Sequence, residues 1–506
     1  MALTILLVWV GTLGMHVRRE YFRGAGERLA LGARSLAPGS YWFTVRMNGA
    51  AIGFGAASLD TIEGGFRLSD DLILDVPALD TVSRAEAQTR LVLDDSLSLR
   101  SFTFRLASAV GRFDVAGVVA DPEVLEVEVG AGTSEPERSR LRVAGGPMLD
   151  VAVPLRLAAS GSLVPGTSVT VRVFDPSTLA SREIEVRVTA TDTLVVPDSA
   201  GLGGDGRWYA AGLDTIPVWR IEQAYGGVRV ATWVDEDGLT VRAESPLGFT
   251  IERTAFELAR QALHETGSDA THAAGYGTLI EGAAIASDVV AGSLEHVDSL
   301  AVRLGGVELD GFDLAGGHQT LRGDTLVIRR RRMALGNTAG YSLPYRGREE
   351  VERELESTPL IQAGDERIAR AAREAVGRTR SPGEAAARLT EWVHRELRKE
   401  IAPSLPSAVQ VLEAKRGDCN EHTVLYVALA RSIGLPARTA VGVVHVRGKF
   451  YYHAWPEVWL RNEWIPFDPT LGQAPADASH IRFLVGGLAR QVELVRLIGR
   501  LQLEVL

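Results

Sequence analysis

Residues 40–260 alternate between apolar and polar side chains along many short segments, and this pattern constrains the fold more than any other feature of the chain. Residues 125–129, for example, read Leu-Glu-Val-Glu-Val. A period of two places successive side chains on opposite faces of a strand, one buried and one solvated. Turn residues separate the segments, as at Asp121-Pro122 and Pro165-Gly166. We therefore expect an antiparallel β region that forms a half-barrel or a sandwich.

The pattern changes to helix after about residue 346. Asp365 is placed to N-cap a helix that runs to Arg378. Ser381 precedes Pro382, a pair typical of a helix start, and this second helix is predicted to continue to about Lys399. A β region followed by a region that mixes helices and strands makes the chain α+β.

A chain of 506 residues is long enough for about three domains. We predict an apolar segment with its basic flank at residues 1–35 and a β-rich domain at 36–263. A connector with a small β region is predicted at 264–345. The domain at 346–506 carries the motifs described below.

Residues 2–17 are almost wholly apolar, and arginines follow at 18, 19, 23 and 28. As a helix this segment would span about 24 Å, somewhat less than the hydrocarbon core of a bilayer. We interpret it as an uncleaved membrane anchor, the alternative being a buried N-terminal helix. The basic flank alone would place the body in the cytoplasm. However, a start codon assigned slightly late would omit basic residues that precede the apolar segment. We therefore expect the rest of the protein to be extracytoplasmic, in the periplasm.

The charge balance and the cysteine content exclude several classes of protein. Fifty-four basic against 64 acidic residues give a net charge of −10, which is unfavourable for binding nucleic acid. The single cysteine, Cys419, excludes a disulfide within the chain and any site that needs several thiolates. Residues 235–238 resemble the start of a calcium loop, but the sequence that follows has no glutamate at the twelfth position of such a loop. We predict no metal and no cofactor.

Cys419 follows Asp418, a good N-cap, and would be the first residue of an apolar helix that stops at Gly434. The positive end of a helix dipole favours thiolate over thiol. The unpaired N–H groups of the first turn could also hold an oxyanion. Cys419 is therefore the candidate nucleophile, and we expect it to ionise readily.

Two predicted hairpins follow the cysteine helix. A two-residue loop at Arg461-Asn462 would place His453 opposite Thr470, with Asp468 one diagonal step from His453 on the same face of the sheet. Such a carboxylate could reach the imidazole N–H.

This geometry assigns a role to each side chain. Cys419 attacks, His453 takes its proton and returns it to the leaving group, and Asp468 orients the imidazole. His422 is a rival base at i+3, but a base on the cysteine's own helix approaches the sulfur poorly.

The stretches GDCNEHT…ALARSIGLPAR, YYHAWPEVWL and WIPFDPT resemble the transglutaminase-like superfamily in its bacterial form. The resemblance covers about Ser357–Gly472. It implies a papain-like core, in which a helix bearing the cysteine packs on an antiparallel sheet bearing the histidine and the aspartate. The family's nucleophile, histidine and aspartate fall on Cys419, His453 and Asp468. Trp392 and Trp455 are the nearby candidates for the family's oxyanion tryptophan, and its calcium sites find no match.

The resemblance implies acyl transfer from a peptide or side-chain amide through a thioester, which ends on water or on an amine. The substrate would be a peptide or protein, and the enzyme a protease, deamidase or transamidase. The alternative is a catalytically silent scaffold whose β domain binds an envelope component, a lipid or a protein partner. Oligomeric state stays open.

Overall fold

The computed structural model describes residues 25–506 with short gaps, and the predicted anchor at residues 2–17 lies outside it. The gaps are 79–80, 132–135, 226–227, 247, 267–284, 286–293, 295, 331–339, 401–406, 447, 488–489, 491–493, 495–496 and 498–499. Within the described parts of the chain, no helix combines the length and the apolar character needed to cross a membrane.

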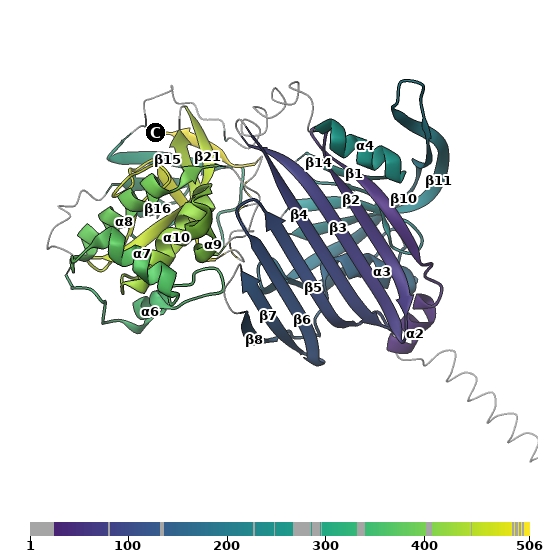
Figure 1. The fold of residues 1–506 in the computed structure, drawn as a ribbon, viewed down its shortest axis with the longest axis horizontal. Helices are drawn as coiled ribbons and strands as arrows, with labels where there is room; N and C mark the ends of the chain where they lie inside the picture. Colours follow the sequence, from purple (N-terminus) through teal and green to yellow (C-terminus); the bar gives the residue numbers. More distant parts are fainter. Residues whose placement is uncertain are drawn as a thin grey trace, which may run out of the picture.

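The N-terminal half is one large antiparallel sheet, as the alternating pattern predicts (Figure 1). Its strands are β1 (Gly39–Met47), β2 (Ala50–Ile62), β3 (Gly65–Ala78), β4 (Thr81–Asp94), β5 (Leu99–Ser108), β6 (Arg112–Asp121), β7 (Val124–Ala131), β8 (Glu137–Arg142), β9 (Ser168–Asp175), β10 (Ala180–Leu202), β11 (Trp208–Tyr225), β12 (Val228–Val234), β13 (Thr240–Glu244) and β14 (Phe249–Thr254). Two meanders, β1–β8 and β9–β14, join where β1 pairs with β14.

The sheet curls over a shared core and leaves β8 and β9 as its two edges. Phe102 on β5 lies 5.7 Å from Phe174 on β9, measured between ring centroids. Helix α3 (Val153–Ala159) contributes Leu155 to the same core, after a short 3₁₀ turn at Asp150–Ala152. The β region is thus an open, curved sheet of the half-barrel kind. Helix α3 was not predicted, because it interrupts the strand pattern for only seven residues.

Two further helices flank this sheet. Helix α2 (Ala25–Ala33) precedes β1, and α4 (Phe256–Thr266) follows β14. Phe256 of α4 meets Trp42 of β1 edge to face, with ring centroids 4.8 Å apart. The aromatic pair fixes α4 against β1 and β2.

The C-terminal half combines a four-stranded sheet with helices on one side (Figure 1). The sheet has the order β22-β21-β20-β23, from strands β20 (Ala437–Val446), β21 (Lys449–Leu460), β22 (Glu463–Pro466) and β23 (His480–Val485). The helices are α6 (Glu349–Glu352), α7 (Glu366–Val376), α8 (Pro382–Glu396), α9 (Ala408–Ala414) and α10 (Cys419–Ser432), with a 3₁₀ turn at Arg353–Leu355. The predicted α+β class is confirmed.

Two hydrophobic cores hold this half together. One joins α7–α10 to the sheet at Ala437 and Val458. The other joins the sheet at Val443 and Phe450 to a smaller sheet of order β16-β17-β15-β24. The strands of the smaller sheet are β15 (Ser299–Gly305), β16 (Gln319–Arg322), β17 (Thr325–Arg329) and β24 (Gln502–Val505). The last strand of the chain therefore pairs with a segment some 200 residues earlier.

The helix starts follow the predicted caps, whereas the helix ends come slightly earlier than predicted. Asp365 accepts from the Arg367 amide at the start of α7, and Ser381 caps α8. Helix α7 ends at Val376 because Gly377 adopts a positive φ of 65°. Helix α8 ends at Glu396, and Arg398–Lys399 then form a short parallel pair, β18, with Arg416–Gly417, β19.

The β region contacts the chain just before the cysteine helix. Gln410 Nε2 on α9 donates to the Arg112 carbonyl at 2.6 Å, and the Arg416 guanidinium donates to the Ala109 carbonyl at 2.7 Å. The turn between β5 and β6 thus buttresses the segment that leads to Asp418.

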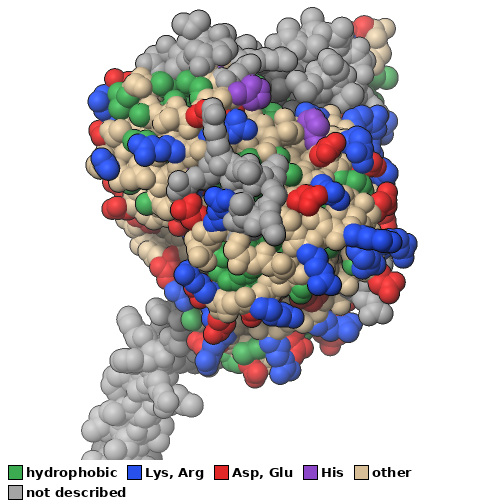
Figure 2. Space-filling model, turned by 90° about the vertical axis from the view of Figure 1, so that its left-hand side faces the viewer, with side chains coloured by type: hydrophobic (Ala, Val, Ile, Leu, Met, Phe, Trp, Pro, Cys, Tyr) green, Lys and Arg blue, Asp and Glu red, His purple; other side chains and the backbone are tan. Residues whose placement is uncertain are grey.

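The outer face of the C-terminal half carries basic and acidic side chains side by side (Figure 2). A protein that binds nucleic acid usually gathers its basic residues into a patch or stripe. This mixed face accords with the negative net charge, and the absence of a nucleic-acid partner stays a prediction.

Candidate active site

Cys419 is the first residue of α10, directly after its N-cap, as predicted. Asp418 accepts from the Asn420 amide at 2.8 Å. Glu421 reaches back and accepts from the Asp418 amide at 2.7 Å, which completes a capping box. The helix behind the cysteine is buried against α7, α8, α9 and β21, so the cysteine sits on a rigid support.

Burial and nearby carboxylates favour the thiol form of Cys419 over the expected thiolate. Burial raises the pKa of the partly buried Cys419 well above its usual value, and the Asp418 carboxylate raises it further. The Ala454 N–H bonds to the sulfur and opposes this rise, whereas Glu421 and Asp468 add to it. The expected easy ionisation is therefore wrong for the resting protein, because the thiol is buried and two carboxylates lie at the positive end of the helix.

The hairpin that carries His453 and Asp468 has the predicted register. Leu460 faces Glu463, and Glu457 faces Pro466. Arg461 and Asn462 form the two-residue loop with φ of 54° and 60°, the left-handed conformation of a type I′ turn.

The pairing of β21 with β22 ends earlier than the predicted register requires. Strand β22 ends at Pro466, so Thr470 is not paired with His453. The next residue, Phe467, still donates its amide to the Pro456 carbonyl at 2.9 Å. The chain then turns, and Asp468 exchanges backbone hydrogen bonds with Gln473.

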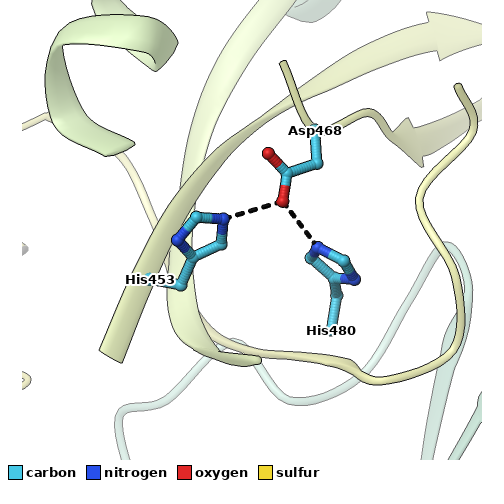
Figure 3. Close-up of side chains that lie close together, drawn as sticks. All are labelled: His453, Asp468 and His480. Carbon is cyan, nitrogen blue, oxygen red and sulfur yellow. Dashed lines mark hydrogen bonds and ion pairs between the residues drawn. The ribbon is translucent and has the colours of Figure 1, made fainter. Parts of the chain in front are cut away.

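His453 and Asp468 are hydrogen-bonded, as the register predicts (Figure 3). His453 Nε2 donates to Asp468 Oδ2 at 2.8 Å, and the Leu471 amide donates to the other oxygen at 2.9 Å. Asp468 is fully buried and His453 is only 9% exposed. Burial opposes ionisation of Asp468, but its interactions with the His453 and His480 imidazoles outweigh it and hold its pKa well below the usual range.

His480, the first residue of β23, is a partner that the sequence reasoning missed (Figure 3). Its Nε2 donates to the same Asp468 oxygen at 2.9 Å, and its Nδ1 donates to Asp477 Oδ1 at 3.3 Å. Burial lowers the pKa of this fully buried imidazole, but the two carboxylates raise it to about 9. His480 is thus an imidazolium at neutral pH. The sequence signal was the short spacing Asp477-x-x-His480 before an apolar strand.

We expect His480 to make stability depend on pH. A folded-state pKa of about 9 against the ordinary value of 6.5 stabilises the fold fully below pH 6.5, and this stabilisation is lost as the pH rises through 9. The loss should be roughly 3 kcal/mol. Urea unfolding at pH 6 and at pH 9.5, compared between the wild type and His480→Gln, measures it. His480→Gln should flatten the slope between pH 6.5 and 8.5, whereas Cys419→Ala should keep it; equal slopes in the wild type and His480→Gln would contradict the assignment.

The ligand atoms of His453, Asp468 and His480 lie within 4.8 Å of one another, a spacing that could hold a metal ion. Both rings, however, direct an N–H at the same carboxylate oxygen. A metal would need the lone pairs of these nitrogens, and it would have to replace both hydrogen bonds. The three side chains therefore fit a carboxylate that accepts from two imidazoles better than they fit a metal site.

The remaining candidates flank the pair. His422 Nδ1 donates to the Asp418 carbonyl at 2.7 Å, a bond within the first turn of its own helix. Trp455 is fully buried, stacks on His453 at 6.0 Å between centroids, and meets His480 edge to face at 5.2 Å. Trp455 therefore packs against both imidazoles, whereas Trp392 lies on α8.

Cys419 reaches this group through the strand that bears His453. Its sulfur accepts the Ala454 N–H, and its side chain packs in the core that contains Ala454. Among the described side chains, no hydrogen bond joins the sulfur to His453. Bonds between a nucleophile and its base are often long before substrate binds.

Comparison with known proteins identifies the fold of this segment. Residues 369–469, about a fifth of the chain, match the family model of the transglutaminase-like superfamily. The matched segment contains Cys419, His453 and Asp468. The predicted resemblance to this superfamily is confirmed for residues 369–469, and the catalytic roles of the three side chains stay a prediction. Comparison with curated proteins gives no match.

Three solved structures show distant likeness. A protein from Cytophaga hutchinsonii, provisionally assigned as a cysteine protease, is 13% identical and covers 41% of this chain and 81% of its own, with a TM-score of 0.28. A β-barrel-like protein of unknown function from Brucella abortus is 15% identical and covers 43% and 94%, with a TM-score of 0.31. A protein from Pseudomonas aeruginosa is 15% identical and covers 38% and 89%, with a TM-score of 0.22. Likeness at this level carries no inference about activity.

Proposed function

We propose that the transglutaminase-like core at residues 369–469 transfers acyl groups from peptide or side-chain amides through a thioester on Cys419. The supporting observation is the buried bond between His453 Nε2 and Asp468 Oδ2 on the strand whose next amide, Ala454 N–H, contacts the Cys419 sulfur. A nucleophile, a base and a carboxylate that orients the base are the parts that acyl transfer requires.

The hydrogen-bond pattern assigns the proton path. His453 donates its Nε2–H to Asp468, so in the neutral imidazole Nδ1 is the nitrogen whose lone pair can accept a proton. Because the thiol is favoured at rest, deprotonation accompanies attack: Nδ1 takes the proton as sulfur bonds to the carbonyl carbon. Asp468 stabilises the imidazolium, which returns the proton to the leaving amine as the C–N bond breaks. Water or a second amine then releases the acyl group from sulfur.

One amide of the first turn is available for the developing oxyanion. The Asn420 and Glu421 amides donate to the Asp418 side chain, and the His422 amide donates to the Asp418 carbonyl. The structure describes no acceptor for the Cys419 amide, which lies beside the attacking sulfur. A backbone N–H in this position stabilises a tetrahedral intermediate.

The test is formation of an acyl-enzyme by the full chain. With p-nitrophenyl acetate, we expect a burst of p-nitrophenol and one acetyl group on Cys419 by intact-mass and peptide mass spectrometry. Acylation should be faster than that of N-acetylcysteine at equal thiolate concentration. Adding a primary amine then separates a transamidase, which forms the amide, from a hydrolase. A Cys419 that acylates no faster than the free thiol would favour the catalytically silent scaffold.

The resting state of the thiol gives a separate prediction. Since burial and the Asp418 carboxylate raise the pKa of Cys419, little thiolate is present at pH 7. Its alkylation by iodoacetamide should be slower than that of a model thiol of pKa about 8.5, and should still rise above pH 8.5. The rate–pH profile measures this. A plateau near pH 6 would instead reveal a resting thiolate–imidazolium pair, and would contradict the raised pKa.

A further inference from the structure

A cavity of about 890 Å³ opens in the β region and shares no residue with the Cys419 site. It lies between α3, β9 and the ends of β4, β5 and β6. Much of its wall is apolar, from Leu29, Leu99, Val119, Val153, Leu157 and Val171. The volume falls within the range of small-molecule sites, which are mostly apolar with a few polar groups that orient the ligand.

Arg156, on α3, contributes a positive charge to this wall. Its guanidinium is partly buried, and its described hydrogen bond is a weak one to the Met148 sulfur at 3.6 Å. Among the described residues, Arg156 forms no ion pair. Asp94 also lines the cavity: its Oδ1 accepts from the Ser96 and Ser98 amides, and its negative charge favours the charged form of Arg156, although the two side chains form no described ion pair.

Two arginines of the sheet beside α3 do have carboxylate partners. Arg172, in the same cavity wall, donates to Glu183, and the buried Arg253 donates to Asp235 at 3.0 Å. Removing a charge from water without pairing it is unfavourable, and burial accordingly lowers the pKa of Arg156. Among the described residues, the Arg156 N–H donors carry only the weak contact to Met148, so they remain to bind an anionic ligand group in the cavity.

We propose that this cavity binds a single-chain amphiphile, with its anionic headgroup on the Arg156 guanidinium and its hydrocarbon chain along the apolar wall. A guanidinium binds carboxylate and phosphate alike through paired N–H donors, so the headgroup class is an oxyanion. The proposal is independent of the acyl-transfer function, because it rests on different residues of a different region.

The experiment is calorimetric titration of the full chain with dodecanoate, dodecyl phosphate and dodecanol, each below its micellar concentration. We expect both anions to bind at least tenfold more tightly than the alcohol. A preference between the two anions identifies the headgroup. From octanoate to dodecanoate, affinity should rise roughly fourfold per methylene. Dodecanol binding as well as the anions, or no binding of any of the three, would overturn the proposal.

Matched arginine variants test the contact itself. Arg156→Met should weaken dodecanoate binding at least tenfold and leave dodecanol binding unchanged. Arg172→Met, in the same wall but already paired with Glu183, should leave both unchanged. Equal losses in the two variants would show a general charge effect and contradict a site at Arg156. The comparison of anion and alcohol on the wild-type chain decides the question even if a variant fails to fold.

Discussion

Replacing Cys419 with alanine is expected to lower the rate of acyl transfer by roughly 10⁶-fold, since loss of the nucleophile of such a triad removes almost all of its rate enhancement. No other thiol can take over, because Cys419 is the only cysteine of the chain. The burst of p-nitrophenol and the acetylated peptide should both disappear. Stopped-flow absorbance and mass spectrometry on the full chain measure these two signals.

The control for this prediction is the fold of the variant. Cys419→Ala keeps Asp418 and Glu421, the two side chains of the capping box, so α10 should still form. Its unfolding midpoint in urea should therefore stay close to that of the wild type. A Cys419→Ala variant that still turns over the ester at a tenth of the wild-type rate would place the activity elsewhere in the molecule.

The second large effect is expected for Asp468→Asn. The loss of the carboxylate should slow acylation by about 10⁴-fold, because an amide neither holds the imidazole in the required tautomer nor stabilises the imidazolium. The same change should lower the free energy of unfolding at pH 7 by about 3–5 kcal/mol, because it leaves the buried His480 imidazolium with Asp477 as its remaining carboxylate. Pre-steady-state kinetics and urea unfolding measure the two effects separately.

Asp477→Asn is the matched control for this second prediction. Asp477 contacts His480 but is not hydrogen-bonded to His453. It should lower the free energy of unfolding while slowing acylation by less than about tenfold. If both variants slowed acylation equally, the effect of Asp468→Asn would come from loss of structure, and the orienting role of Asp468 would be wrong.

Local signals in the sequence were sufficient for much of the candidate site. Asp418 caps α10 through a hydrogen bond that spans two residues, and such bonds depend on nearby side chains alone. The loop at Arg461-Asn462 sets the register of β21 and β22 because a two-residue turn leaves one pairing for the flanking strands. That register places Asp468 within reach of His453. The antiparallel β region follows in the same way from its period of two.

The tertiary structure alone decided how this site is charged and supported. His480 reaches Asp468 only because β23 pairs with β20, and no local pattern marks that pairing. Glu421 and Asp418 counter the helix dipole at Cys419, an effect whose sign depends on burial as well as on residue type. Arg156 and the cavity that it lines are likewise formed by α3, β9 and the ends of β4, β5 and β6, which are distant from one another in the sequence. Local hydrogen bonds and periodicity thus determined the elements and their register. Burial and long-range pairing, which sum contributions from distant parts of the chain, determined the electrostatics.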